Sequence, residues 1–129
     1  LGARTAAGVD VDGPSVSAAR RNAALNGVAG AEFQEAPADF DAAPAFASAL
    51  VAELGAFDVV VANILRRPLV ALAPALAAAA RPGATLALTG LRDELGDFEA
   101  IVSAFSAYFK DFRKVDLEGG WILVEATRM

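Results

Sequence analysis

The sequence predicts an α/β fold whose mostly parallel sheet ends in an antiparallel hairpin. The run FDVVVANIL, residues 57–65, is apolar and β-branched over the length of one strand, which is typical of a buried parallel strand. Near the end of the chain, segments 112–117 and 121–127 have strand character and flank Glu118-Gly119-Gly120, a hairpin signal. Segments with helical periodicity lie between the strand-like ones, as in a Rossmann-type sheet.

The remaining elements follow from local signals. We predict the last turn of a helix over residues 1–4, strands over 5–9, 31–35 and 84–89, and helices over 14–26, 46–54, 68–80 and 93–108. Residues 81–83, Arg-Pro-Gly, are expected to form a turn. Pro74 is expected either to kink the helix 68–80 or to begin a second helix.

Inward positions are predicted at Val16, Ala19, Ala23 and Leu25 in helix 14–26, and at Leu95, Phe98, Ile101, Val102, Phe105 and Phe109 in and just after helix 93–108. Trp121 is expected to pack at the sheet edge.

Composition restricts the class of protein. With 129 residues and 13.2 kDa, the chain has the length of one domain, residues 1–129, and can bury a core. No uninterrupted apolar run approaches the roughly 20 residues that a membrane span needs, so we expect no membrane partner. A net charge of -5 argues against a nucleic-acid-binding surface and favours a basic protein partner.

The sequence contains neither cysteine nor histidine. A disulfide framework, cysteine catalysis, serine-histidine hydrolysis and histidine-based zinc chemistry are therefore excluded for this chain, and we assign no metal-binding residue. The lack of cysteine fits a reducing compartment, for which we expect the cytoplasm or an organelle matrix.

Asp10 is the first candidate binding residue, because it follows the predicted strand 5–9. In a nucleotide-type Rossmann fold an acid at such a position holds ribose hydroxyl groups, since a carboxylate accepts two hydrogen bonds from a vicinal diol. Val11 beside it is a candidate apolar surface for adenine. The alternative for Asp10 is a simple turn. For Asp12 we favour a helix N-cap, because Gly13-Pro14 follows it.

Three motifs, GVDVD at 8–12, NAALNGV at 22–28 and FDVVVANIL at 57–65, resemble those of the ribosomal protein L11 methyltransferases (the PrmA type). Their order and spacing are similar to that family's catalytic domain from just after its glycine-rich motif to its end. The resemblance implies a Rossmann-like S-adenosylmethionine-dependent methyltransferase fold, a mostly parallel sheet with a C-terminal antiparallel hairpin, with the first strand and the glycine loop missing from this sequence.

The resemblance also implies site residues. Asn63, Ile64 and Leu65 would form the catalytic segment, in which carbonyl groups accept hydrogen bonds from the target amine and Ile64 and Leu65 shape the acceptor slot. Asp10 and Val11 would bind the cofactor, S-adenosylmethionine, and Asp39 would reach the adenine amino group. The alternatives are a helix N-cap before Arg66 for Asn63, and an exposed loop carboxylate for Asp39.

In that fold the missing strand lies between the strands that begin near residues 5 and 57. Two strands would then have unpaired edges, and we expect the 129-residue chain alone to be unstable and inactive. Three arrangements are open: the polypeptide extends upstream, a partner chain supplies the strand, or the two flanking strands pair with each other.

The resemblance predicts a protein methyltransferase that modifies lysine or N-terminal amino groups of a ribosomal protein. One alternative is a catalytically inactive methyltransferase-like structural or assembly subunit of a larger complex. Another is a nicotinamide-dependent oxidoreductase, which the acid after the strand fits equally well, although the final hairpin and the Asn-Ile-Leu segment make it the weaker hypothesis.

Overall fold

The computed structural model describes residues 2–129 and divides into two compact units. The N-terminal unit is Leu1–Asp39 and the C-terminal unit is Phe40–Met129. Leu1 lies outside the described residues, and residues 2–4 are not helical, so the predicted helical turn over 1–4 is wrong in the part that is described.

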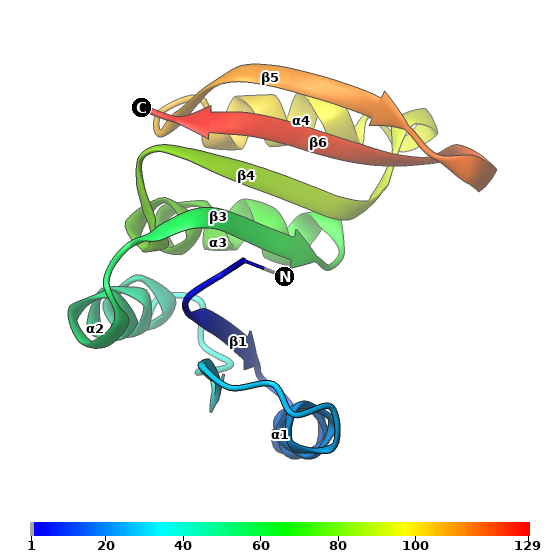
Figure 1. The fold of residues 1–129 in the computed structure, drawn as a ribbon. Helices are drawn as coiled ribbons and strands as arrows, with labels where there is room; N and C mark the ends of the chain where they lie inside the picture. The colour runs from blue at the N-terminus through cyan, green and yellow to red at the C-terminus, as the bar shows by residue number, and fades with distance from the viewer. Residues whose placement is uncertain (1) are drawn as a thin grey trace. The chain divides into compact units, whose positions relative to one another are not determined.

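In the N-terminal unit, strands β1 (Ala6–Asp10) and β2 (Ala31–Glu35) pair in parallel, and helix α1 (Gly13–Leu25) connects them (Figure 1). A parallel pair requires such a crossover, because the chain must return to the same end of the sheet. The strands and the helix therefore agree with the sequence prediction to within one residue or two.

The ends of α1 follow from its sequence. The Asp12 carboxylate accepts a hydrogen bond from the Ser15 N–H at 2.8 Å and caps the helix, as predicted. Asn26 and Gly27, the latter with φ of 62°, end it. The predicted inward position of Leu25 is wrong: its side chain is 84% exposed, because it is the last helical residue and points away from the sheet-facing stripe that contains Val16.

The C-terminal unit contains a four-stranded sheet in the order β3–β4–β6–β5. Its strands are β3 (Phe57–Asn63), β4 (Ala80–Arg92), β5 (Phe109–Asp116) and β6 (Trp121–Arg128). The pair β3–β4 is parallel, whereas β4–β6 and β6–β5 are antiparallel, which confirms the final hairpin. A short 3₁₀ turn, η2 (Glu118–Gly120), joins its strands. Because β6 is an inner strand, Trp121 lies at a strand end rather than at the sheet edge, and the expectation for it is wrong.

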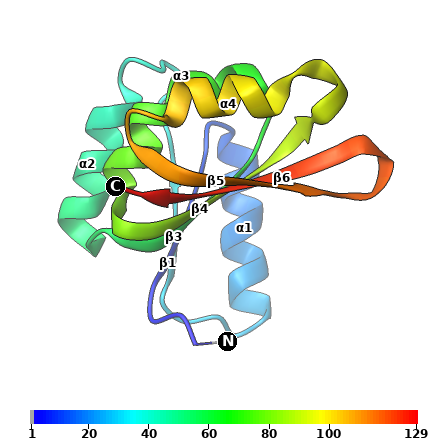
Figure 2. The same ribbon diagram turned by 90° about the horizontal axis from the view of Figure 1, so that it is seen from above.

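Three helices complete the unit: α2 (Ala43–Leu54), α3 (Arg66–Ala79) and α4 (Asp97–Phe105), with a 3₁₀ turn η1 (Asp93–Leu95) before α4. Helices α3 and α4 lie on one face of the sheet (Figure 2). Strands contribute alternate residues to that face and helices contribute one stripe. The fully buried side chains of this core include Leu69, Leu86, Leu88, Leu91, Ile101, Phe105, Phe109, Ile122 and Val124.

The predicted helix 93–108 is shorter in the structure, and its start differs. Gly96 has φ of 68°, a left-handed conformation that separates η1 from α4. This break removes Leu95 from the helical stripe, so its predicted inward position is wrong and its side chain is 62% exposed. Ile101 and Phe105 are buried as predicted, and the Phe105 and Phe109 rings pack with their centroids 5.9 Å apart.

Helix α3 begins at Arg66, two residues before the predicted start, and continues through Pro74 as one helix. Strand β4 includes the predicted turn at residues 81–83. Phe57 pairs with Ala80 but Val59 pairs with Thr85, so the Arg-Pro-Gly segment forms a bulge in a longer strand.

The open strand edges agree with the sequence prediction. Among the described residues, β1 is hydrogen-bonded to β2 alone and β3 to β4 alone, because the two sheets are separate. The arrangement in which the strands flanking the missing one pair with each other is therefore wrong. In the C-terminal unit, Val59 and Val61 on β3 are 56% and 67% exposed, so the sheet face opposite α3 is open at this edge.

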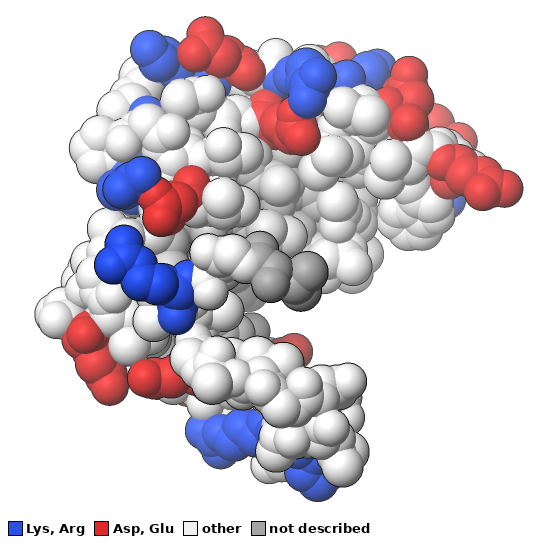
Figure 3. Space-filling model, in the orientation of Figure 1, with Lys and Arg blue, Asp and Glu red and all other residues white. Residues whose placement is uncertain are grey.

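Charged side chains of both signs are interspersed over the C-terminal unit on the face that Figure 3 shows. Three ion pairs of this unit join Arg113 to Glu125, Lys114 to Asp93, and Arg92 to Glu94. Within residues 2–129, no helix combines the length and the apolar character that crossing a membrane requires.

Candidate active-site segments

Asn63 ends strand β3, and the two residues after it connect the strand to helix α3. Asn63 pairs in register with Thr89 of β4, and this is the carboxyl end of the parallel pair, where ligands bind in open α/β sheets. Asn63 and Ile64 are exposed, Ile64 at 38%, and Leu65 is 70% exposed. The predicted catalytic segment Asn63-Ile64-Leu65 is therefore a continuous surface turn in the C-terminal unit.

The structure excludes the helix-capping alternative for Asn63. The N-cap of α3 is Leu65, whose backbone is extended and whose carbonyl accepts the Leu69 N–H at 3.2 Å. No side chain caps this helix. The Asn63 amide consequently has no capping role and is available to a ligand as both donor and acceptor.

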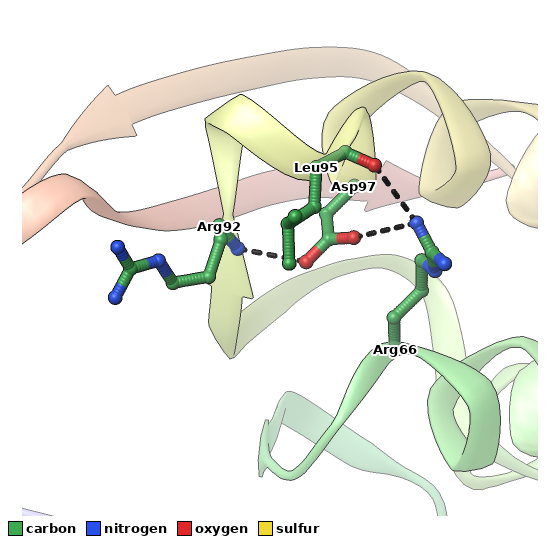
Figure 4. A network of polar contacts seen from close by, with 4 residues as sticks. All are labelled: Arg66, Arg92, Leu95 and Asp97. Carbon is green, nitrogen blue, oxygen red and sulfur yellow. Dashed lines mark hydrogen bonds and ion pairs between the residues drawn. The ribbon is translucent and has the colours of Figure 1, made fainter.

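Arg66, the first residue of α3, connects this turn to the segment before α4 (Figure 4). Its Nη1 donates to Asp97 Oδ1 at 2.8 Å and to the Leu95 carbonyl at 2.9 Å. The other oxygen of Asp97 accepts the Arg92 backbone N–H at 2.7 Å. The Asp97 side chain is 5% exposed, and each oxygen of this nearly buried carboxylate accepts a hydrogen bond from the protein.

The charges at the two helix ends explain this arrangement. A cation at a helix N-terminus is unfavourable, and the first turn of α3 contains Arg66 and Arg67 but no acid. Asp97, by contrast, is the first residue of α4, where the helix dipole favours a carboxylate. The ion pair therefore offsets the unfavourable position of Arg66. Sequence reasoning missed the pair, because 31 residues separate its members and neither belongs to a motif.

Asp10 is the last residue of β1 in the N-terminal unit and is exposed. Its Oδ1 accepts the Asp12 backbone N–H at 3.0 Å, and this bond fixes the carboxylate just beyond the strand. Asp12 itself accepts from both the Ser15 hydroxyl and the Ser15 N–H, and these bonds hold the pKa of Asp12 below its usual value. Asp12 is therefore a capping residue, whereas Asp10 is exposed and its role in binding ribose stays a prediction.

The other predicted cofactor-binding residues also lie in the N-terminal unit. Val11 follows Asp10 directly and is 57% exposed. Asp39 lies in the exposed loop after β2, and its role in binding adenine stays a prediction. Sequence reasoning did not single out Glu35, which pairs in register with Asp10 at the carboxyl end of β2. The sequence signal that could have indicated Glu35 was its position as the last residue of a predicted strand, as for Asp10.

Two shallow hollows occur on the C-terminal unit, with volumes of about 220 and 330 Å³. Residues of β5 and β6 and the β4 residue Thr85 line the first, and the region around Trp121 and Asp93 lines the second. Asn63 lines neither of these two hollows.

The mixed sheet, the helices on its face and the polar turn after β3 define the class: a Rossmann-like methyltransferase fold. A crystal structure of a ribosomal protein L11 methylase from Lactobacillus delbrueckii subsp. bulgaricus matches 98% of this chain and 59% of its own, with a TM-score of 0.75 and 27% identity. The fold is also that of an RNA methyltransferase from Salinibacter ruber, solved with S-adenosyl-L-homocysteine (TM-score 0.62, 23% identity, 96% of this chain and 65% of that one).

The sequence comparison identifies the family. The family model "Ribosomal protein L11 methyltransferase (PrmA)" matches residues 1–129, and the chain belongs to this family. It is 41% identical over 129 residues to the ribosomal protein L11 methyltransferase of Pseudomonas putida (strain GB-1). That alignment covers 99% of this chain and 39% of the relative, so the chain spans about two fifths of the curated protein that it matches.

Proposed function

We propose that the protein is an S-adenosylmethionine-dependent methyltransferase that methylates amino groups, on lysine or at the N-terminus, of a ribosomal protein. The observation that carries this proposal is the exposed Asn63-Ile64 turn at the carboxyl end of β3, in a chain of this family, with an amide that does not cap the following helix. A ribosomal substrate places the reaction in the cytoplasm, where ribosomal proteins are made.

The donor supplies an electrophilic methyl group on a positively charged sulfur. The residues of this chain are assigned two tasks. Asp10 is assigned to the ribose, because its exposed carboxylate lies at the end of a parallel strand. One carboxylate oxygen accepts the Asp12 N–H, and the other can accept a ribose hydroxyl. Val11 offers an exposed apolar surface beside it for the adenine ring.

Asn63 and Ile64 act on the acceptor. A neutral amine must aim its lone pair at the methyl carbon, in line with the carbon–sulfur bond. Carbonyl oxygens of the Asn63 side chain and the Ile64 backbone accept the amine hydrogens and so set that direction. The nitrogen lone pair forms the new N–C bond, the C–S electron pair returns to sulfur, and the amine proton leaves to water. This chemistry needs no histidine base, and the chain has none.

The test is methyl transfer by the whole gene product from a donor with an isotopically labelled methyl group to isolated ribosomal proteins, followed by peptide mapping. The proposal predicts label on amino groups of one ribosomal protein, and an Asn63→Ala variant with kcat lowered about 100- to 1000-fold, as for other lost transition-state hydrogen bonds. Asp58→Ala, which removes an exposed β3 carboxylate paired with Arg81, is the matched control and retains activity. A folded protein that labels nothing would support the structural-subunit alternative.

A further inference from the structure

Gly90, near the end of β4, lies against the backbone of the Asn63-Ile64 turn. A Cβ atom at position 90 would lie 2.7 Å from the Ile64 carbonyl oxygen, 3.1 Å from the Ile64 carbonyl carbon and 3.1 Å from Asn63 Oδ1. Side-chain carbons do not approach other atoms as closely as 2.7 Å, so the turn occupies the space that any other residue at position 90 would need.

The strand pairing explains this close approach. Asn63 and Thr89 are register partners in the parallel pair β3–β4, so Ile64, the first residue after β3, lies beside Gly90, which is still within β4. On its other edge β4 pairs with β6, and that register shifts by one residue between Leu88 and Leu91. Gly90 is therefore part of a bulge, with φ of 80°, at the point where the chain passes the end of β3.

We propose that Gly90 is a positioning residue for the methyl acceptor. Its missing side chain lets the Ile64 carbonyl and the Asn63 side-chain carbonyl occupy their places beyond the carboxyl end of β3. These are the two oxygens to which the proposed function assigns the amine hydrogens, and the inference rests on that function. A methyl group at position 90 must displace the Ile64 carbonyl, and a displacement of about 1 Å in a reacting geometry lowers the rate about 100-fold.

The same strand provides a matched control. Gly83 has φ of 81°, nearly the same as Gly90, but a Cβ atom built there meets no atom within 4 Å. Alanine at either position adopts the same unfavourable left-handed backbone. The difference between Gly90→Ala and Gly83→Ala therefore isolates the contact with the Asn63-Ile64 turn from the strain of the backbone.

The experiment compares the whole gene product with its Gly90→Ala and Gly83→Ala variants in steady-state methyl transfer to the ribosomal substrate. The inference predicts that Gly90→Ala lowers kcat about 100-fold while the donor KM stays within about twofold of wild type. Gly83→Ala should retain both constants. Equal kcat values for the two variants, or a change confined to the donor KM, would overturn the inference.

A double-mutant cycle separates positioning from a general structural role. If Gly90 acts through the Asn63-Ile64 turn, Gly90→Ala adds little to the loss already caused by Asn63→Ala, because both changes disturb one constellation. Multiplicative losses in the double variant would show that Gly90 acts elsewhere, and the inference would be wrong.

Nuclear magnetic resonance supplies a measurement that does not depend on activity. The side-chain amide signals of Asn63 and the carbonyl signal of Ile64 should shift in Gly90→Ala and stay in place in Gly83→Ala, and unchanged signals in both would contradict the inference. Unfolding of Gly90→Ala alone would assign the glycine to folding and overturn it as well. An inactive wild-type protein would instead refute the proposed function, and that outcome differs from an active wild type with an unaffected Gly90→Ala variant.

Discussion

The two units of this protein differ in how much of each is buried in a packed core. In the C-terminal unit, α3 and α4 pack on a four-stranded sheet, and side chains such as Leu86, Ile101 and Phe105 have no exposed surface. In the described part of the N-terminal unit, Val16 is the one residue that is buried, and its sheet has two strands. Two strands with a single helix bury little apolar surface, and such a sheet is at best marginally stable by itself.

Because of this difference in packing, the two proposed tasks depend on units of unequal stability. The segment assigned to the amine, Asn63-Ile64, follows a strand of the packed sheet. Arg66, just after this segment, is paired with the nearly buried Asp97 carboxylate. The residue assigned to the ribose, Asp10, is attached to the sparsely packed unit and depends on local hydrogen bonds such as that from the Asp12 N–H. The segment to which the proposal assigns the chemical step therefore lies on the better-packed unit.

The largest expected effect is on the core of the C-terminal unit. Phe105→Ala removes a fully buried ring that packs on Phe109 and should lower the free energy of unfolding by about 3 to 5 kcal/mol. Urea denaturation followed by tryptophan fluorescence measures it, since Trp121 is in this unit. A loss below about 1 kcal/mol would show that this core is not what stabilises the unit.

Removal of the nearly buried carboxylate comes next. Asp97→Ala leaves Arg66 without its partner at a helix N-terminus and leaves the Arg92 N–H unsatisfied. We expect a loss of about 3 kcal/mol, the lower end for such pairs because the Arg66 side chain is 40% exposed. Asp93→Ala, which breaks the more exposed pair with Lys114, should lose about 1 kcal/mol or less in the same denaturation assay. Similar losses for both variants would contradict this account.

Sequence reasoning predicted what depends on local pattern. The apolar run at β3, the Asp12 cap and the final hairpin each follow from a few neighbouring residues, and the structure confirms them. The same apolar run predicted Asn63 at the end of that strand, and the strand bounds agree.

The errors and omissions have a common physical cause, because they depend on distant parts of the chain. Leu95 is predicted to face inward if the helix begins at residue 93. Gly96 interrupts that helix, and the Leu95 side chain is exposed. The Arg66–Asp97 pair and the contact of Gly90 with Ile64 exist only once β3, β4 and α4 have packed. No local signal in the sequence indicates either of them.

A smaller effect is expected in the N-terminal unit. Val16→Ala removes two buried carbons and should lower the local stability of that unit by about 1 to 2 kcal/mol. Hydrogen exchange of the β1 and β2 amides should become faster, while the amides of β4 and β6 keep their wild-type rates. Faster exchange in both units would show that they unfold together.

The smallest effect concerns the start of α1 and acid. Hydrogen bonds from the Ser15 hydroxyl and N–H hold the pKa of Asp12 below its ordinary value of 3.8. The cap therefore stabilises α1 fully above that unfolded value, and its contribution is lost as the pH falls through the lower folded pKa. Carbon-detected titration of the Asp12 carboxylate should show a midpoint below 3.8. A midpoint at or above that value would contradict the capping geometry.

The proposed function assigns donor binding to the N-terminal unit and the chemical step to the C-terminal unit. Its most direct test is the steady-state kinetics of Asp10→Ala and Asn63→Ala in the whole gene product at varied donor concentration. The account predicts that Asp10→Ala raises the donor KM about 10- to 100-fold with little change in kcat. Asn63→Ala should lower kcat about 100-fold or more with an unchanged donor KM. The opposite assignment of the two effects, or the same change in both variants, would contradict it.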